Sequence, residues 1–391
     1  MAGIDEFLAD RERAGCLRNL NPVSWRENAK VRIGSKKYID FSSNDYLGLS
    51  SHPKVKEAAK KAIDEFGYGA GASRLMSGDL KLHHLLEDRT AKFKHKEAAL
   101  VFNSGYQANI GIVSSLCSKA DCIFSDRLNH ASIVDGILLS GARFFRFRHS
   151  DTEHLELLLK KERKKFREAL VITESIFSMD GDKSPLKDIA RLKEKYDFKF
   201  MVDEAHATGV FGVDGSGLVK EEGVTDKVDL IMGTFSKALG GFGAYLACSK
   251  KVARYLINSC RSFIYSTALP AAVIAGNLMS IQLIEKEPWR RIKLLDLSCF
   301  FRGVLQKNGF KPLGASQIVP IVIGDNLKTV EFAQGMQKKG FWVLPIRPPT
   351  VPQGQALLRF SLIVNHEKEI LSNLVDELAN IRAILSIRDA G

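Results

Sequence analysis

A single lysine, Lys237, stands between a run of apolar residues and a run of glycines. The apolar run, 228–233, predicts a buried strand, and residues 234–245 read TFSKALGGFGAY. Burying an ammonium group costs several kcal/mol unless the group is paired. A lysine in this position is therefore better suited to act as a neutral amine, which can form a Schiff base with an aldehyde.

Other reactive side chains follow the neighbouring predicted strands. The stretch MVDEAHATG places Asp203 and His206 just beyond one strand, Ser178 follows the strand before it, and Thr234 immediately precedes the lysine segment. The carboxyl ends of parallel strands meet at one edge of a sheet, where ligands bind in α/β folds. We therefore expect these side chains to face one crevice.

An acid, a histidine, hydroxyls and a lysine together suit a cofactor that is at once an aldehyde, a heteroaromatic base and a phosphate. Pyridoxal 5'-phosphate (PLP) has all three properties. Asp203 would keep the pyridine nitrogen protonated, so that the ring withdraws electrons from a carbanion, and His206 could bond the ring hydroxyl. Each residue alone is more often a surface lysine or a helix cap, but their occurrence at successive strand ends favours a site.

A phosphate group needs backbone N–H groups at the start of a helix. The stretch FNSGYQANIGIV provides a strand, a turn containing Gly105 and Tyr106, and then a helix. The glycine-rich stretch 67–78 lacks the spacing of a dinucleotide-binding loop, and the sequence has no P-loop motif. The phosphate of PLP is therefore expected at residues 104–106.

Histidines elsewhere divide into one candidate and one structural pair. His130 lies where a loop meets a helix after the strand 121–126, so it could stack on a ring or handle a proton. A solvent-facing helix-start histidine is an equally good interpretation of the local sequence. His83 and His84 are adjacent on a helical segment and point to different faces, so no metal site is predicted from them.

Seven apolar segments predict strands, and helical segments separate most of them. The strands are expected at 97–103, 121–126, 142–147, 168–175, 199–205, 228–234 and 243–249. Continuous apolar strands with helical crossovers indicate a mostly parallel sheet covered on both faces. After residue 286 short strands alternate with helices, which is typical of a smaller α+β domain. The expected organisation is an N-terminal helix and hairpin (1–50), a large α/β domain (51–285) and a C-terminal α+β domain (286–391).

Composition places the chain among ordinary soluble proteins. It has 391 residues, of which 45% are hydrophobic and 26% charged, and no segment is long and apolar enough to span a membrane. The N-terminus lacks a secretory signal and the six cysteines form no C-x-x-C pair, so a reducing cytoplasmic location is expected. The net charge of +12 fits either a solvated basic surface or a polyanionic substrate. Because the longest basic run has no interleaved aromatic residues, nucleic-acid binding is not expected.

Taken together, the motifs resemble the α-oxoamine synthases, PLP-dependent acyltransferases of fold type I. The resemblance covers nearly the whole chain. The matching stretches are FSSNDYLGLS, GAGASRLMSGD, FNSGYQAN, DRLNHAS, FSMDGD, VDEAHATGVFG, TFSKALGG, YSTALP and RPPTVPQGQALLRFSL. Members of this family condense an amino acid with an acyl-CoA and release carbon dioxide. The resemblance implies a mostly parallel seven-stranded sheet in a large domain, a smaller α+β domain, and a homodimer with shared active sites.

The resemblance also implies roles for residues that match the family's motifs. Lys237 would form the Schiff base and move the substrate proton, Asp203 would pair with the pyridine nitrogen and His206 with the ring hydroxyl. His130 would stack on the ring. Further cofactor contacts would come from Ser178, Gly105, Tyr106, Thr234 and, from the partner subunit, Thr267. Arg359 would bind the amino-acid carboxylate through its planar fork of donors, with Asn44 nearby, and Thr350 and Arg18 would lie near the acyl substrate.

Within the family, the residues 346–362 are most similar to the branch that condenses L-alanine with pimeloyl-CoA, or a pimeloyl carrier-protein thioester, in biotin biosynthesis. Members of the family that use glycine or serine are the alternatives. Alanine differs from glycine by one methyl group and from serine by one hydroxyl group, so the pockets that distinguish these substrates differ only slightly. A non-catalytic protein of the same fold is a further alternative. The presence of both Lys237 and Asp203 argues against it.

Overall fold

The computed structural model describes residues 3–388, which form two compact units. One unit consists of Leu49–Ser178 and Lys183–Arg291. The other consists of the described residues up to Gly48, the segment Met179–Asp182 and the described residues from Ile292 onward. The outermost residues of the expected first and last domains, 1–2 and 389–391, lie outside the described part of the chain.

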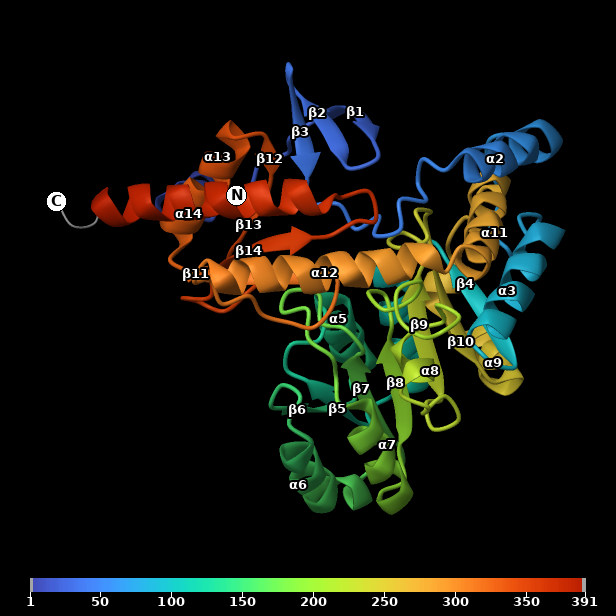
Figure 1. Ribbon diagram of the computed structural model, residues 1–391. Coiled ribbons are helices and arrows are strands. Elements are labelled where there is room, and N and C mark those ends of the chain that lie inside the picture. Colours follow the sequence, from blue (N-terminus) through green and yellow to red (C-terminus); the bar gives the residue numbers. More distant parts are fainter. Residues whose placement is uncertain (1–2, 389–391) are drawn as a thin grey trace. The chain divides into compact units, whose positions relative to one another are not determined.

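The first unit is built on a seven-stranded sheet (Figure 1). All seven predicted strands are present. Their bounds are β4 (Ala98–Phe102), β5 (Cys122–Asp126), β6 (Arg143–Phe147), β7 (Ala169–Glu174), β8 (Lys199–Asp203), β9 (Leu230–Thr234) and β10 (Ala244–Cys248). The strand order is β4-β10-β9-β8-β7-β5-β6, and only β10 runs antiparallel to its neighbours. The predicted mostly parallel sheet is therefore confirmed.

Helices follow most of these strands, as the alternating pattern requires. They are α2 (Pro53–Phe66), α3 (Lys81–Phe93), α4 (Gly105–Leu116), α5 (Ala131–Ser140), α6 (Thr152–Glu162), α7 (Leu186–Lys195), α8 (Leu218–Glu221), α9 (Lys250–Ser259), α10 (Arg261–Ile264) and α11 (Ala271–Lys286). Helix α7 shows why such segments fold against the sheet, since Leu186, Ile189 and Ala190 form one buried stripe.

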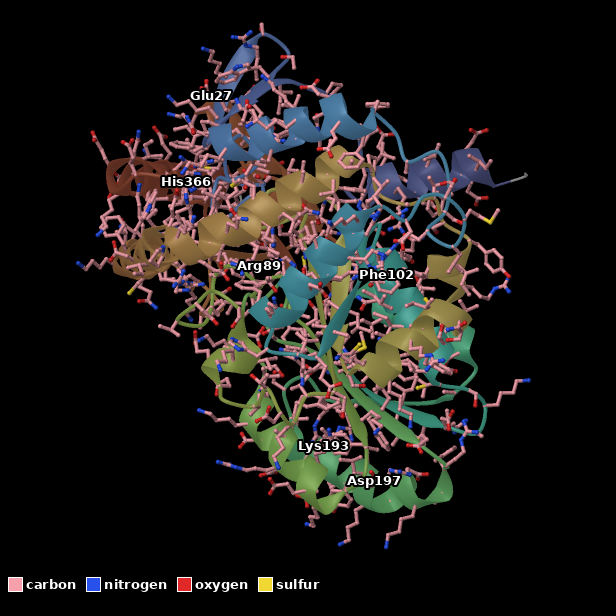
Figure 2. The ribbon with its side chains drawn as sticks, turned by 90° about the vertical axis from the view of Figure 1, so that its right-hand side faces the viewer. Glu27, Arg89, Phe102, Lys193, Asp197 and His366 are labelled. Carbon is pink, nitrogen blue, oxygen red and sulfur yellow. The ribbon has the colours of Figure 1, made fainter. Side chains whose placement is uncertain are left out.

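The core of this unit lies between the sheet and helices α4, α5 and α9. Apolar side chains that alternate along the strands pack against apolar stripes of these helices, which buries both surfaces. Phe102, at the end of β4, is labelled in Figure 2. Its ring packs edge-on against that of Phe263 on α10, with ring centres 5.8 Å apart. This contact packs α10 against the end of β4.

The second unit contains two smaller sheets and four helices. The sheets have the orders β1-β2-β3-β12 and β11-β14-β13. The strands are β1 (Val23–Glu27), β2 (Lys30–Ile33), β3 (Lys36–Asp40), β11 (Ile318–Gly324), β12 (Phe341–Trp342), β13 (Pro345–Ile346) and β14 (Ala356–Ser361), and the helices are α1 (Ile4–Arg13), α12 (Trp289–Lys307), α13 (Asn326–Lys338) and α14 (Lys368–Arg388). The predicted N-terminal hairpin is β2–β3, in which Ile33 pairs with Lys36 across the turn, and β3 pairs in parallel with β12. The N-terminal hairpin thus shares a sheet with the C-terminal part of the chain.

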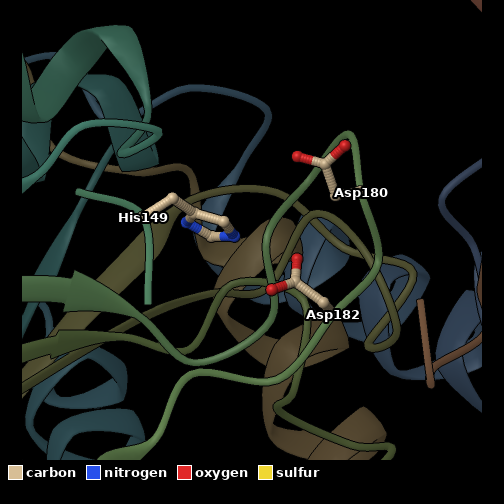
Figure 3. A group of neighbouring side chains, drawn as sticks. All are labelled: His149, Asp180 and Asp182. Carbon is tan, nitrogen blue, oxygen red and sulfur yellow. The ribbon is translucent and has the colours of Figure 1, made fainter. Parts of the chain in front are cut away.

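The short loop Met179–Asp182 also belongs to this second unit. Its Gly181 accepts hydrogen bonds from the backbone N–H of Ala315 (2.9 Å) and the hydroxyl of Ser316 (2.8 Å). Gly181 has a φ of +67°, and a Cβ there would lie 2.5 Å from the carbonyl oxygen of Ile318. Only glycine fits this close approach. Figure 3 shows the side chains of Asp180 and Asp182 on the same loop.

Candidate active site

A pocket of about 190 Å³ lies where β7, β8 and β9 end and where α4 and α5 begin. Among its lining residues are seven that the sequence predicts as cofactor ligands: Gly105, Tyr106, His130, Asp203, His206, Thr234 and Lys237. The lining also includes six residues that the sequence analysis did not nominate: Asn109, Ser132, Glu174, Ala205, Met232 and Ser236. Of the side chains expected together at the strand ends, the lining contains Asp203, His206, Thr234 and Lys237, whereas Ser178 is not part of it.

Lys237 is half-buried in the wall of this pocket. Its Nζ lies 2.8 Å from Nε2 of His206. The glycines that follow have a steric cause, which is clearest at Gly240. Its φ is +66°, and a Cβ would lie 2.2 Å from the backbone nitrogen of Ser50. The chain therefore needs glycine there to turn back after the lysine.

Asp203 is the last residue of β8 and is 5% exposed. Its Oδ1 accepts a hydrogen bond from the backbone N–H of Ala205 (2.9 Å), and its Oδ2 accepts one from Nδ2 of Asn109 (2.9 Å). Two donors from different elements thus hold the carboxylate in one orientation at the pocket. Bonds of this kind favour the charged form of a carboxylate.

The segment after β8, which carries His206, is anchored by a buried ion pair. The side chains of Lys94 and Glu204 are each 1% exposed and directly bonded. Glu204 also accepts a hydrogen bond from the backbone N–H of Val219 (2.8 Å), and Lys94 donates to the carbonyl oxygen of Ser216. Moving Glu204 away from Lys94 would leave an unpaired charge in the protein interior, which is strongly destabilising. The ion pair therefore keeps the backbone around Glu204 in one position.

Glu174 ends β7 and lies opposite Asp203 in the strand register. It is 4% exposed, and its Oε1 accepts a hydrogen bond from the backbone N–H of His130 (2.7 Å). Burial, together with the neighbouring Asp203 carboxylate, raises the pKa of Glu174 well above its usual value, although Lys237 opposes the shift. Glu174 therefore holds its proton more tightly than an exposed glutamate does.

His130 caps the start of α5 and faces the pocket. Its Nδ1 lies 2.8 Å from the hydroxyl of Ser132 and accepts a hydrogen bond from the backbone N–H of that residue (3.2 Å). The ring stands edge-on to Tyr106, with ring centres 6.5 Å apart. Removal of water by the surrounding protein lowers the pKa of His130, and the charge of Lys237 adds to this, while Asp203 opposes it.

An anion-binding corner is formed by the start of α4 and the end of β9. Ser104 caps α4 by accepting a hydrogen bond from the backbone N–H of Gln107 (3.2 Å), and Gly105 and Tyr106 form the first turn. The backbone N–H groups of a first helical turn have no acceptor within the helix. The hydroxyls of Thr234 and Ser236, 2.7 Å apart, lie in the lining of the same pocket.

Two predicted cofactor ligands lie outside this lining within the single chain. Ser178 is half-buried in the turn after β7. Thr267 is exposed, and its carbonyl oxygen accepts a hydrogen bond from Nδ2 of Asn103 (2.8 Å). Thr267 lines a separate small cavity that also contains Arg74. Its predicted role concerns the partner subunit, so the single chain does not test it.

The four predicted substrate ligands belong to the second unit. Arg359, on β14, is 9% exposed and donates hydrogen bonds to the hydroxyl of Ser361 (2.6 Å), to Oδ1 of Asn44 (3.3 Å) and to the hydroxyl of Tyr46 (3.4 Å). Asn44 and Arg359 are therefore direct neighbours. A second pair forms between Arg18 and Thr350, whose side chains bond at 2.9 Å.

A larger cavity, of about 430 Å³, lies at the opposite ends of the strands, where β7, β8 and β9 begin. Its lysine Lys96 donates to the carbonyl oxygens of Thr225 (2.7 Å) and Val228 (2.6 Å). The pocket of about 190 Å³ is the better candidate for catalysis. Its Lys237 lies within hydrogen-bonding distance of His206, and the buried Asp203 belongs to the same lining.

The donor set of the smaller pocket fits PLP. It contains an amine for the aldehyde, the carboxylate of Asp203 for the pyridine nitrogen, a histidine ring as a wall, and first-turn N–H groups with hydroxyls for the phosphate. Burial of Asp203 and its two fixed donors suit a permanent partner for a cationic ring nitrogen. The residues present thus match each functional group of that cofactor.

Fold and site define an α/β protein with a pocket that contains a lysine, a histidine and a buried acid at the carboxyl edge of a mostly parallel sheet. The chain belongs to the aminotransferase class I and II family, whose model matches residues 36–378.

Similar proteins are known for nearly the full length of the chain. An 8-amino-7-oxononanoate synthase from Geobacter sulfurreducens is 46% identical over 383 residues, covering 97% of this chain and 98% of the relative. The enzyme of the same name from Geotalea daltonii is 43% identical and covers 99% of both chains. Among solved structures, a variant of the serine palmitoyltransferase from S. paucimobilis, in its PLP- and myriocin-bound form, superposes with a TM-score of 0.93. It is 28% identical and covers 99% of this chain and 98% of that one.

Proposed function

We propose that this protein is a PLP-dependent acyltransferase of biotin biosynthesis. It condenses L-alanine with pimeloyl-CoA, or with a pimeloyl carrier-protein thioester, to give 8-amino-7-oxononanoate, carbon dioxide and a free thiol. The observation that carries the proposal is one pocket that combines Lys237 with His206 and a buried Asp203. Full-length identity of 43–46% to synthases of this name supports the choice of reaction.

Bound PLP supplies an aldehyde for the amino group and an electron-withdrawing ring for the carbanion at Cα. Lys237 would hold the aldehyde covalently in the resting protein and then, as a free amine, accept the Cα proton of alanine. Asp203 would keep a proton on the ring nitrogen, and His206 would bond the ring hydroxyl. His130 would lie against the ring face, and Ser178 would add a further contact.

The phosphate would be held by the corner at the start of α4. The backbone N–H groups of Gly105 and Tyr106 would bind its oxygens, and the positive end of the helix favours a negative charge there. The hydroxyls of Thr234 and Ser236 would add two further bonds. Thr267 of the partner subunit would complete this set, which makes a homodimer with shared sites part of the proposal.

The amino-acid carboxylate would be bound by Arg359. Its hydrogen bonds to Asn44, Tyr46 and Ser361 hold the guanidinium in one orientation. A planar guanidinium of this kind binds a carboxylate through two parallel bonds. Arg18 and Thr350, which bond each other, would lie near the acyl chain.

Use of glycine or serine is the alternative, because serine palmitoyltransferase superposes closely on this chain. The higher identity to the alanine-using branch makes alanine the preferred substrate. The charge of +12 suits a thioester donor that bears phosphates. Among residues 3–388, no helix is long and apolar enough to cross a membrane, and a cytoplasmic location is part of the proposal.

Spectroscopy of the purified protein tests the cofactor and the amino acid together. Addition of PLP should produce a visible absorption band, and L-alanine should change that band more than glycine or L-serine does. A band that responds only to glycine or serine would retain the cofactor and overturn the substrate. Complete absence of a band would overturn the proposal as a whole.

A further inference from the structure

Asn109 bonds two residues of the pocket that come from different elements. It lies on α4, is 1% exposed, and its Nδ2 donates to Oδ2 of Asp203 (2.9 Å) and to the hydroxyl oxygen of Ser132 (3.0 Å). A carboxylate can only accept hydrogen bonds. The amide must therefore present its NH₂ group to both partners, since the opposite orientation would set its carbonyl oxygen against the carboxylate.

The backbone of Ser132 decides which nitrogen of His130 carries the ring proton. The N–H of Ser132 donates to Nδ1 of His130 at 3.2 Å, so Nδ1 is an acceptor and the proton of the neutral ring is on Nε2. The hydroxyl of Ser132 lies 2.8 Å from the same Nδ1 and therefore donates to it. Ser132 is fully buried, and its oxygen at the same time accepts the bond from Nδ2 of Asn109.

We propose that Asn109 is a positioning residue that couples Asp203 to His130 through Ser132 and keeps His130 neutral with its proton on Nε2. Asn109 would thereby hold in place both Asp203, the proposed partner of the ring nitrogen, and His130, which is proposed to stack on the ring. These two roles rest on the proposed function, whereas the hydrogen bonds of Asn109 and Ser132 lie within the protein itself. It can therefore be tested without the cofactor.

Four ionisable groups from different parts of the fold face His130 and influence whether its ring takes up a proton. They are Asp203 at the end of β8, Lys237 after β9, Asp135 on α5, and Glu174 at the end of β7. From α4, Tyr106 faces the ring and donates its hydroxyl proton to Asp135. Asp203 and Asp135 favour a proton on the ring, and Lys237 disfavours it. Protonation at Nδ1 must also break the two bonds from Ser132.

Loss of Asn109 should therefore make His130 easier to protonate. The bond from Asn109 polarises the hydroxyl of Ser132 and strengthens its bond to the unprotonated Nδ1. Without the amide this bond is weaker and opposes protonation less, so the pKa of His130 should rise by at most roughly one unit, the equivalent of one ordinary hydrogen bond. Because Asn109 acts on His130 through Ser132, this rise should depend on the presence of the hydroxyl.

The experiment is an NMR titration of the histidines in the cofactor-free, full-length protein, with His130 assigned by its loss in H130Q. Four proteins form a double-mutant cycle: the unmodified chain, N109L, S132A and N109L/S132A. Leucine has nearly the volume of asparagine but no donor. We expect long-range nitrogen spectra to place the proton on Nε2 in the unmodified chain, and the pKa of His130 to rise in N109L. In the S132A background, the same substitution should shift the pKa by less than half as much.

A proton on Nδ1 in the unmodified chain, or an equal shift in both backgrounds, would overturn the proposal. An unchanged pKa in N109L would do the same. If N109L does not fold, as judged by circular dichroism, S132A alone decides, because loss of the hydroxyl donor should also raise the pKa of His130. None of these titrations requires PLP. If the proposed function is wrong, the failure appears in the absorption spectra with amino acids, and the titration results are unaffected.

Discussion

The amine of Lys237 lies 2.8 Å from Nε2 of His206, although 31 residues separate them in the chain. The sheet brings them together, since one follows β9 and the other follows β8, and these strands are parallel neighbours. The amine is thus held next to a group that can exchange a proton with it. The proposed function requires Lys237 to react as a neutral amine.

Replacement of this lysine has the most direct expected effect. In Lys237→Ala the visible absorption band of the lysine-bound cofactor should be lost, because no amine remains for the aldehyde. Activity should fall by at least about 100- to 10,000-fold, the usual contribution of a positioned acid–base group. Lys251→Ala, which changes an exposed lysine on α9, serves as the control and should keep both band and rate. A band that survives in Lys237→Ala would refute the assignment.

Asp203→Asn separates binding of the cofactor from its activation. Asparagine has one acceptor oxygen, so it can keep one of the two bonds that Asp203 accepts from Ala205 and Asn109, and the pocket should keep its shape and some affinity for PLP. It cannot hold the ring nitrogen protonated, so kcat should fall by two or more orders of magnitude, by roughly 3 kcal/mol or more in activation free energy. Asp226→Asn, at an exposed site near the opposite ends of the strands, is the matched control. Near-normal turnover in Asp203→Asn would contradict the proposed role.

Glu174→Gln should change how stability depends on pH in the cofactor-free protein. The pKa of Glu174 is raised in the native state, so above the ordinary value of 4.5 the unfolded chain releases this proton while the native chain keeps it. The unfolded state then binds fewer protons, and stability decreases as pH rises. Glutamine keeps an oxygen that accepts the hydrogen bond from the backbone N–H of His130, but it does not titrate, so it removes this loss of stability at higher pH.

The midpoint of thermal unfolding, measured from pH 5 to pH 8, checks this expectation. Glu174→Gln should gain stability relative to the unmodified chain as pH rises, by at most about 1.4 kcal/mol per pH unit. The exposed Glu153→Gln should show no such trend. Parallel pH profiles for Glu174→Gln and the unmodified chain would show that the carboxyl is ionised in the native state.

Arg359→Lys should weaken binding of the amino acid and leave the cofactor in place. Lysine keeps the charge but loses the planar pair of donors, so KM for alanine should rise by about tenfold or more. The absorption band with PLP alone should be unchanged. Arg382→Lys, which alters an arginine that caps carbonyl oxygens of Asn308 and Gly309, is the control. An unchanged KM in Arg359→Lys would remove Arg359 from the substrate site.

Local patterns predicted the sheet, because each of its strands is an apolar run bounded by turn or helix signals. The run that ends at Thr234, for example, is buried at every position of β9. The pairing of β3 with β12 was not predictable in this way, since it joins residues about 300 positions apart. β12 is two residues long, and such pairing depends on tertiary packing rather than on local pattern.

The site was predictable where a reactive residue directly follows a strand, as for Asp203 and Lys237. Glu174 gave the same signal, a charged residue at the end of an apolar strand, and was not nominated. Asn109 gave a weaker one: it lies one helical turn after Gly105 on α4, so it returns to the side of the helix that faces the pocket. Ser132 had no signal of its own, because its importance comes from its bonds to His130 at the start of the same helix and to Asn109 on α4.

The most direct test of the central claim is an assay of the PLP-loaded protein with pimeloyl-CoA and each amino acid in turn. The proposed function predicts that L-alanine alone supports rapid release of thiol and carbon dioxide in equal amounts, with 8-amino-7-oxononanoate as the product. Faster release with glycine or L-serine would contradict the substrate. No release with any amino acid and either pimeloyl donor would contradict the proposed reaction.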